Sequence, residues 1–315
     1  MSQKTGLTLG LDCGGTNVKM AIVEDNGHLR HSTLQRISYD CAAETSIDAI
    51  AAGAIKYLAE QKVQIDSLGV GIAGDVDPET GTVRFSPNLG WKNVAFGTLL
   101  RRHFTVPLHI DNDANCAAWG AYWLDAKRDC KNLICLTLGT GVGGGIIIDG
   151  KLYRGSTGAA GEIGHMTLQT DGRACKCGNF GCLESVVGAW GIIQSAEEAL
   201  KKNRAPLLKK MLEKKSELSP KLIAAAADAG DVECQELWKS TGEYLGCALV
   251  NLVNIFNPDR IVLSGGVSKS GNRLLDPALK ILSQRAFQSS VKAAQVSISE
   301  FDEKLGVVGA ALLGS

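Results

Sequence analysis

The sequence has no long apolar run and no excess of charge of either sign. It contains 33 Lys and Arg residues against 33 Asp and Glu residues, so no overall field favours nucleic acid or an anionic membrane surface. Glycine and polar residues interrupt every apolar stretch before it reaches the roughly 20 residues that a membrane-spanning helix needs. Residues 1–10 hold no apolar core of signal-peptide length. These absences predict a cytoplasmic protein with no membrane and no nucleic-acid partner.

The 315 residues also contain no linker rich in proline or serine. A domain takes roughly 100–200 residues, so the length fits two domains. Without a flexible tether, we expect the two domains to abut over a cleft. We place a smaller N-terminal α/β domain at residues 1–115 plus 301–315 and a larger α/β domain at residues 116–300.

Apolar periodicity in the first third predicts strands interrupted by helices. Period-two runs and short apolar runs predict strands, and apolar residues at helical spacing predict helices. The expected strands lie at residues 8–11, 18–23, 29–37, 68–72 and 108–110, and the expected helices at 47–58 and 94–103. This order is typical of an α/β layer on a mixed sheet.

The opening pattern recurs in the second half. The apolar residues 133–138 run into the glycine-rich residues 139–145 and then into the apolar residues 146–148, as residues 7–11 run into residues 12–17. Two strand–loop–strand units suggest a duplicated core. Further along, residues 245–256 have the spacing of a helix that stops before Pro258, and residues 260–263 form a strand that ends in Ser264-Gly265-Gly266.

Three glycine loops at strand ends could hold a phosphate chain or a nucleotide. Glycine lets backbone N–H groups approach phosphate oxygens closely. The first loop, Asp12-Cys13-Gly14-Gly15-Thr16-Asn17, adds a hydroxyl and an amide, and Asp12 could hold Mg²⁺. One such loop alone is more simply a glycine turn, but three favour a nucleotide. None fits the Walker pattern or a dinucleotide fingerprint.

Asp111-Asn112-Asp113-Ala114-Asn115 follows a strand and precedes a helix-like segment. Asp and Asn are preferred helix caps, and on spacing alone capping is the simpler interpretation. The functional alternative is a carboxylate at a strand end that accepts the proton of a substrate hydroxyl.

Three of the ten cysteines crowd together at Cys175, Cys177 and Cys182, and His165 stands ten residues before them. Three thiolates and one imidazole form a closed tetrahedral set suited to structural Zn²⁺. Gly178 and Gly181 fit the tight turns of such a zinc knuckle, which falls in the larger domain. With all four positions filled by protein, the ion would not activate water.

Together these motifs resemble the ROK family of bacterial sugar kinases, repressors and related open reading frames. The most specific part is Glu162-x-Gly164-His165 followed by Cys175-x-Cys177-Gly178-x-x-Gly181-Cys182-x-Glu184. The resemblance implies an actin-like ATPase fold, also called ribonuclease H-like, with two domains, a duplicated mixed-sheet core, and ATP and a sugar in the cleft.

The resemblance also implies roles for individual residues. Asp113 is the expected catalytic base, and His165, Cys175, Cys177 and Cys182 match the zinc set. The expected sugar ligands are Asn88, Asn112, Asp113, Glu162, His165 and Glu184. The expected ATP-binding residues are Asp12, Gly14, Gly15, Thr16, Asn17, Lys19, Gly139, Thr140, Gly141, Gly265 and Gly266.

We therefore expect ATP-dependent phosphorylation of a hexose, with Mg²⁺ and structural Zn²⁺, in a homo-oligomer that is most simply a dimer. Ser86-Pro87-Asn88-Leu89-Gly90-Trp91 resembles the segment of glucokinases, so glucose is the expected substrate. Fructose, mannose, N-acetylmannosamine, N-acetylglucosamine and allose remain alternatives. A transcriptional repressor is the main rival, but only about ten residues precede Asp12, too few for a DNA-reading domain. A non-catalytic member of the family is the second rival.

Overall fold

The computed structural model describes residues 5–215 and 217–314, and its contacts divide the chain into two compact units. The first unit lies within residues 1–130, 145–161 and 300–315, and the second within residues 131–144 and 162–299. The division expected from the sequence put residues 116–130 and 145–161 in the larger domain, whereas the contacts group them with the first unit. The domain boundaries stay a prediction.

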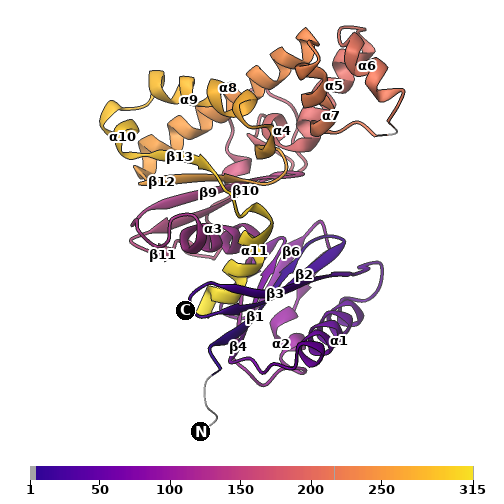
Figure 1. The fold of residues 1–315 in the computed structure, drawn as a ribbon, viewed down its shortest axis with the longest axis vertical. Coiled ribbons are helices and arrows are strands. Elements are labelled where there is room, and N and C mark those ends of the chain that lie inside the picture. The colour runs from indigo at the N-terminus through magenta and orange to yellow at the C-terminus, as the bar shows by residue number, and fades with distance from the viewer. Residues whose placement is uncertain (1–4, 216, 315) are drawn as a thin grey trace. The chain divides into compact units, whose positions relative to one another are not determined.

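The first unit is built on a five-stranded mixed sheet (Figure 1). Its strand order is β3-β2-β1-β4-β8, in which β2 pairs antiparallel with β1 and β3, while β1, β4 and β8 run parallel. The strands are β1 (Leu7–Cys13), β2 (Asn17–Glu24), β3 (Leu29–Arg36), β4 (Ser67–Ile72) and β8 (Leu108–Asn112). The carboxyl ends of β1, β4 and β8 therefore meet at one edge of the sheet.

Helices and a small sheet complete the first unit. Its remaining elements are α1 (Ala43–Gln61), β5 (Asp75–Asp77), β6 (Thr82–Ser86), β7 (Trp91–Val94), α2 (Phe96–Leu100), α3 (Asp113–Leu124), α11 (Asp302–Ala311) and η3 (Leu312–Gly314). The helix expected at residues 94–103 is shorter than predicted, because β7 takes up residue 94 and the helix ends at Leu100. α1 and α2 share a buried apolar cluster with the sheet.

α11 packs closely on the sheet because glycines on the strands leave it room. A Cβ atom at Gly10 of β1 would lie 2.1 Å from the carbonyl oxygen of Val307, and one at Gly69 of β4 would lie 1.8 Å from that of Ala310. α3 packs against α11 in the same way, since a Cβ atom at Gly309 would lie 1.7 Å from the carbonyl oxygen of Cys116. These contacts fix the start of α3 against the carboxyl ends of the strands.

The second sheet repeats the plan of the first. Its order is β11-β10-β9-β12-β13, with a β10–β11 antiparallel pair and with β9, β12 and β13 parallel. The strands are β9 (Leu133–Leu138), β10 (Val142–Ile148), β11 (Lys151–Leu152), β12 (Arg260–Ser264) and β13 (Gln295–Ile298). The same sequence of antiparallel and then parallel neighbours in both sheets confirms the expected duplication of a mixed-sheet core.

The glycines at positions 143–145, which the sequence placed in a loop, lie within β10. A Cβ atom at Gly145 would lie 2.5 Å from the Cβ of Ala118 and 2.7 Å from the carbonyl oxygen of Ala114, both in α3. Glycine at this position therefore allows close helix–strand packing rather than a turn.

Helices make up most of the rest of the second unit. They are η1 (Ile163–His165), α4 (Glu184–Val187), α5 (Ala189–Lys201), α6 (Pro206–Leu212), α7 (Pro220–Asp228), α8 (Val232–Phe256), η2 (Ser268–Ser270), α9 (Asn272–Arg285) and α10 (Gln288–Ala293). α8 begins well before the expected residue 245, because the Asp231 side chain caps it by accepting the Cys234 N–H at 3.2 Å. Among the described residues, no helix combines the length and apolar character needed to span a membrane.

Candidate functional site

The first glycine loop connects β1 to β2 in a tight turn. The Gly14 N–H donates to the carbonyl oxygen of Asn17 at 3.0 Å, and the Asn17 amide donates to the Thr16 hydroxyl at 3.0 Å. Gly15 is exposed, and a Cβ atom there would lie 3.5 Å from the carbonyl oxygen of Asn88. The fold thus brings Asn88, an expected sugar ligand, beside the expected phosphate loop.

Asp12 lies just before this loop, in the parallel part of the sheet. Burial raises its pKa to about 6, the negative charge of Asp113 adds to the rise, and Lys19 opposes it. The ammonium group of Lys19 donates to the backbone oxygen of Glu303 beside the start of α11, so it is held by the protein rather than pointing freely into solvent. A carboxylate whose ionised form is this unfavourable is suited to binding a cation.

The Asp111–Asn115 segment fulfils the capping role that its spacing predicted. The Asn112 side-chain oxygen accepts the N–H groups of Ala114 at 2.8 Å and Asn115 at 3.1 Å, and its amide donates to the carbonyl oxygen of Gly74 at 3.0 Å. This cap starts α3 directly at the end of β8.

Asp113 is the first residue of α3, and burial raises the pKa of its carboxyl group. Hydrogen bonds from its own and the Ala114 backbone N–H groups and from the Asn112 side chain act in the opposite direction. Asp113 therefore combines a fixed backbone position with a carboxylate that is more basic than an ordinary aspartate. Helix capping and a role for this segment in accepting a proton are compatible, because Asn112 caps the helix and Asp113 carries the basic carboxylate.

Asp111 is the buried acid of the segment, and the sequence analysis gave it no role. Its side chain is 2% exposed, and it pairs with the Nε of Arg154 at 2.7 Å. It also accepts the amide of Asn115 at 2.8 Å and the N–H of Asn112 at 2.8 Å. Arg154 follows β11 in a loop, and nothing in its local sequence marks it as the partner of an acid more than forty residues away.

In the second unit, two glycine loops lie at the ends of neighbouring parallel strands. Thr137 of β9 and Ser264 of β12 are in register, and the Val267 N–H donates to the carbonyl oxygen of Leu138 at 2.9 Å. Gly265 has a φ of +91°, and a Cβ atom there would lie 2.4 Å from that same oxygen. The fold thus brings the loop Gly139-Thr140-Gly141 and the loop Gly265-Gly266 together.

Glu184 ties the second glycine loop to the cysteine-rich segment. Its Oε2 accepts the Val142 N–H at 2.9 Å, and its Oε1 accepts the indole N–H of Trp190 at 3.3 Å. A Cβ atom at Gly141 would lie 2.1 Å from Oε2, so a larger residue at this position would displace the Glu184 carboxylate. The sequence did not indicate Trp190 or this link between the two segments.

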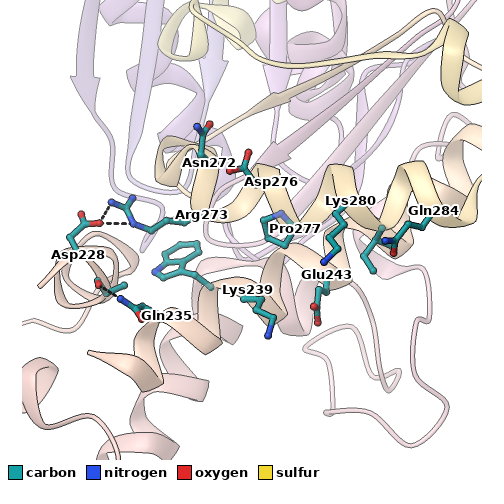
Figure 2. Close-up of a pocket in the computed structure, with 13 residues that line it drawn as sticks. Asp228, Gln235, Lys239, Glu243, Asn272, Arg273, Asp276, Pro277, Lys280 and Gln284 are labelled. Atoms are coloured by element: carbon teal, nitrogen blue, oxygen red, sulfur yellow. Dashed lines mark hydrogen bonds and ion pairs between the residues drawn. The ribbon is translucent and has the colours of Figure 1, made fainter. Parts of the chain in front are cut away.

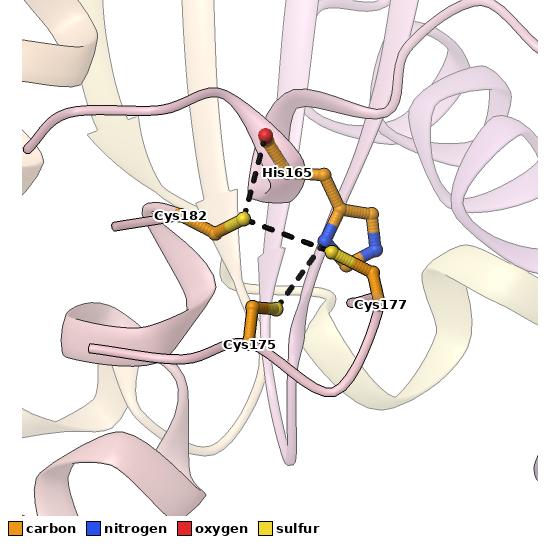
Figure 3. Close-up of side chains that lie close together, drawn as sticks. All are labelled: His165, Cys175, Cys177 and Cys182. Atoms are coloured by element: carbon orange, nitrogen blue, oxygen red, sulfur yellow. Dashed lines mark hydrogen bonds between the residues drawn. The ribbon is translucent and has the colours of Figure 1, made fainter. Parts of the chain in front are cut away.

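His165, Cys175, Cys177 and Cys182 converge as the sequence predicted (Figure 3). Their ligand atoms all lie within 4.8 Å of one another. The sulfur atoms of Cys177 and Cys182 are 3.8 Å apart, and Cys175 Sγ lies 3.8 Å from His165 Nδ1. A tetrahedral ion with Zn–S bonds of about 2.3 Å would hold sulfur atoms roughly 3.8 Å apart, so the four groups fit zinc.

The loops around this set require their glycines. Gly181 has a φ of +64°, and a Cβ atom there would lie 1.7 Å from the carbonyl oxygen of Gln169. Burial raises the pKa of the Cys175 and Cys182 thiols, so their deprotonation calls for a bound cation. The Nε2 of His165 lies 3.9 Å from Glu162 Oε2, which leaves Nδ1 directed at the sulfur atoms.

Two cavities lie away from the expected ligands. One of about 610 Å³ lies in the second unit along α7, α8 and α9, over Trp238 and beside the Asp228–Arg273 ion pair (Figure 2). The other, of about 740 Å³, lies in the first unit beside β8 and includes Arg154 and His109. Neither is lined by a residue that the sequence analysis selected.

Comparisons with known proteins agree with these features. The chain is 35% identical to a glucokinase from Halalkalibacterium halodurans over 305 residues, which cover 96% of this chain and 92% of that protein. A solved ROK family glucokinase from Streptomyces griseus, in complex with glucose and AMPPNP, superposes with a TM-score of 0.82 at 33% identity and covers 97% of this chain and 98% of that one.

Regulators are also among the relatives. A xylose repressor from Caldicellulosiruptor bescii is 34% identical over 242 residues, which cover 77% of this chain and 60% of the repressor. The ROK family model matches residues 8–315. The actin-like fold expected from the sequence is thereby confirmed, and the chain belongs to the ROK family.

Proposed function

We propose that this protein is an ATP-dependent hexokinase that converts glucose to glucose 6-phosphate, with Asp113 as the general base. One observation carries the proposal: Asp113 begins α3 at the end of β8, with a raised pKa, and its charge acts on Asp12, which precedes the first glycine loop. A basic carboxylate near a phosphate-binding turn is the arrangement that phosphoryl transfer to an alcohol requires.

In the reaction, the 6-hydroxyl oxygen of glucose attacks the γ-phosphorus of ATP, and its proton passes to a carboxylate oxygen of Asp113. The new O–P bond forms as the bond to the β–γ bridging oxygen breaks, and ADP leaves. General-base assistance of this kind is worth about 10²–10⁴-fold in rate. The raised pKa of Asp113 strengthens the carboxylate as a proton acceptor.

The glycine loops supply the proposed ATP-binding residues. The assigned residues are Asp12, Gly14, Gly15, Thr16, Asn17, Lys19, Gly139, Thr140, Gly141, Gly265 and Gly266. When bound with the nucleotide, Mg²⁺ neutralises phosphate charge, and Asp12 is the residue that would hold it. Binding of a cation would also keep Asp12 ionised, although burial raises its pKa to about 6. Because the Lys19 ammonium bonds to the Glu303 backbone, we assign Lys19 an electrostatic rather than a direct contact with phosphate.

The proposed sugar ligands are Asn88, Asn112, Asp113, Glu162, His165 and Glu184. Asn112 accepts two backbone N–H groups, donates to Gly74 and also hydrogen-bonds the Asp113 carboxyl group, so it could donate to a sugar oxygen only by sharing or exchanging one of these bonds. Glu184 accepts one bond on each oxygen and retains further lone pairs for sugar hydroxyls. A sugar that leaves these groups unpaired would be rejected.

Zinc held by His165, Cys175, Cys177 and Cys182 would have a structural role. All four ligand positions come from the protein, so no open position remains for water. The ion would fix the segment that carries Glu162, His165 and Glu184, three of the proposed sugar ligands. His165 could then present its Nε2 to Glu162 or to the sugar.

The named relatives support glucose over other hexoses. The Halalkalibacterium halodurans relative is named a glucokinase, and the Streptomyces griseus structure holds glucose and AMPPNP. The test is coupled ADP release with Mg²⁺-ATP across glucose, fructose, mannose, allose, N-acetylmannosamine and N-acetylglucosamine. Glucose should give the highest kcat/KM. A higher value with another hexose would replace glucose in the proposal, and no release with any sugar would refute the kinase assignment.

We further propose that the protein acts in the cytoplasm as a homodimer. Sedimentation of the purified chain should give twice the mass of 33.2 kDa. A monomer at micromolar concentration would contradict the dimer.

A further inference from the structure

The buried carboxylate of Asp111 has one cationic partner, and that partner comes from a distant part of the chain. Arg154 Nε lies 2.7 Å from Asp111 Oδ2, and the Arg154 side chain is 35% exposed while that of Asp111 is 2% exposed. Burying a carboxylate costs free energy unless a cation and hydrogen-bond donors compensate it. Arg154 supplies the cation, and Asn112 and Asn115 supply the donors.

The donors to Asp111 are the residues that set the start of α3. Asp111 Oδ1 accepts both the Asn112 N–H and the Asn115 amide, each at 2.8 Å. Asn112 in turn caps the helix through the N–H groups of Ala114 and Asn115. Asp113 lies between these residues in the chain, so the Arg154–Asp111 pair bears on its position through two separate bonds.

The Arg154–Asp111 pair also contributes to the electrostatic environment at the carboxyl ends of β1, β4 and β8. Asp12, Gly71 and Asp111 are in register across β1, β4 and β8, and a Cβ atom at Gly71 would lie 3.0 Å from Cys116 Sγ and 3.6 Å from the Asp113 Cα. Burial raises the pKa of the Cys116 thiol; the charges of Asp111, Asp12 and Asp113 add to the rise and Arg154 opposes it. The charges of three carboxyl groups and of one arginine thus all affect the pKa of the buried Cys116 thiol.

We infer that Arg154 is a positioning residue for the proposed base: it neutralises Asp111 and thereby holds the Asn112 cap and Asp113 in the arrangement that takes the substrate proton. The inference rests on the proposed function. Arg154 touches no proposed substrate ligand directly, so its loss should lower kcat far more than it raises the KM for glucose. A misplacement of about 1 Å in a catalytic group can cost about 10²-fold, and this is the expected loss of kcat for Arg154→Ala.

The cavity beside β8 allows the missing group to be supplied from solution. Arg154 lines this space of about 740 Å³ together with Arg84, Arg101, His109, Asp77 and Glu79. Arg84 is bound to Asp75 and lies 3.8 Å from Asp77, so these groups form a separate ion-pair cluster. Guanidinium ion at millimolar concentration, far below denaturing levels, should enter and restore kcat of Arg154→Ala about tenfold. Arg154→Lys should retain an intermediate kcat, because an ammonium group supplies the charge without the planar guanidinium.

The decisive experiment measures kcat and KM for wild type, Arg154→Met, Asp111→Asn and the double variant. Removing the Asp111 charge should relieve the loss of Arg154, so the double variant should have at least tenfold higher kcat than Arg154→Met. Arg101→Met is the matched control: Arg101 lines the same cavity, its side chain makes no hydrogen bond or ion pair within the described residues, and the variant should keep wild-type kcat with no response to guanidinium.

Two results would overturn the inference: a kcat of Arg154→Met within threefold of wild type, or losses that guanidinium does not relieve in Arg154→Ala and Asp111→Asn does not relieve in Arg154→Met. Wild-type protein with no hexokinase activity would instead refute the proposed function. In that case the thermal midpoints of the same four proteins still test the ion pair, since Asp111→Asn should recover most of the loss of midpoint caused by Arg154→Met, and additive losses would refute it.

Discussion

The start of α3 and the cysteine-rich knuckle each hold proposed sugar ligands, but by different physical means. At α3, parallel strands in register and a complete set of hydrogen bonds fix Asn112 and Asp113. In the knuckle, isolated bridges, such as Thr167 with Cys182, and single backbone hydrogen bonds join the loops, and the ligand atoms of four side chains converge. One region is ordered by its backbone, whereas the other depends on its side chains and the ion that they fit.

The comparison predicts a large effect in the knuckle, on both metal content and activity. Cys177→Ser should lose the zinc, which mass spectrometry of the metal content should show as a fall from one ion per chain towards none. Hexokinase activity should fall about 10–100-fold, because the segment that carries Glu162 and Glu184 loses its cross-link. Cys247→Ser, at a cysteine outside the cluster, is the control and should change neither quantity. Full activity in a zinc-free Cys177→Ser protein would show that the backbone alone orders the knuckle.

A second prediction concerns the free energy that ionisation of Asp12 costs the folded protein. Because burial raises the pKa of Asp12 from 3.8 to about 6, ionisation of Asp12 destabilises the fold. This free-energy cost is absent at pH values below 3.8, the pKa of Asp12 in the unfolded chain. It grows as pH rises from 3.8 towards the folded-state pKa of about 6 and is complete above that pH. Asp12→Asn should therefore stabilise the metal-free protein by up to about 2–3 kcal/mol at pH 8.

The measurement is urea unfolding of wild type and Asp12→Asn at pH 4, 6 and 8. The difference in the free energy of unfolding should grow between pH 4 and pH 6 and then level off. A difference that does not change with pH would mean that Asp12 is ionised as easily in the folded chain as in the unfolded chain.

A third prediction concerns the fall of kcat/KM at acidic pH. Asp113 must be ionised to accept a proton, and burial raises its pKa above the ordinary 3.8, so kcat/KM should fall as pH drops through a pKa above that value. The fall should approach tenfold per pH unit below that pKa. A pH-rate profile with saturating Mg²⁺-ATP measures it. A profile that is flat down to pH 4.5 would show that the environment of Asp113 does not raise its pKa.

The smallest expected effect separates this chain from the repressors of its family. With equal numbers of acidic and basic residues, the described fold should give no sequence-specific retention of DNA in a gel shift at physiological salt. A shift that an unrelated competitor DNA does not remove would favour the repressor function instead.

Local sequence predicted the elements whose signals are local. The strands of the two five-stranded sheets except β11 and β13, the stop before Pro258 and the convergence of His165 with three cysteines follow from apolar periodicity, proline and ligand spacing. The glycines 143–145 were misplaced because a glycine that permits a helix to pack on a strand looks the same as one that makes a turn.

What could not be predicted depends on contacts between distant segments. The Arg154–Asp111 ion pair and the bond from the Val142 N–H to Glu184 each join residues whose relation only the fold reveals. The roles of Asn88 and Lys19 were inferred from resemblance, that of Asp12 also from its place at a strand end, and all three stay predictions.

The most direct test of the account is the kcat of Asp113→Asn. Asparagine keeps the size of the side chain at the first position of α3 but cannot accept the proton, so kcat should fall by about 10²–10⁴-fold. Calorimetry should still detect glucose binding, since the other proposed sugar ligands remain. A kcat close to that of wild type would contradict the assignment of Asp113 as the base.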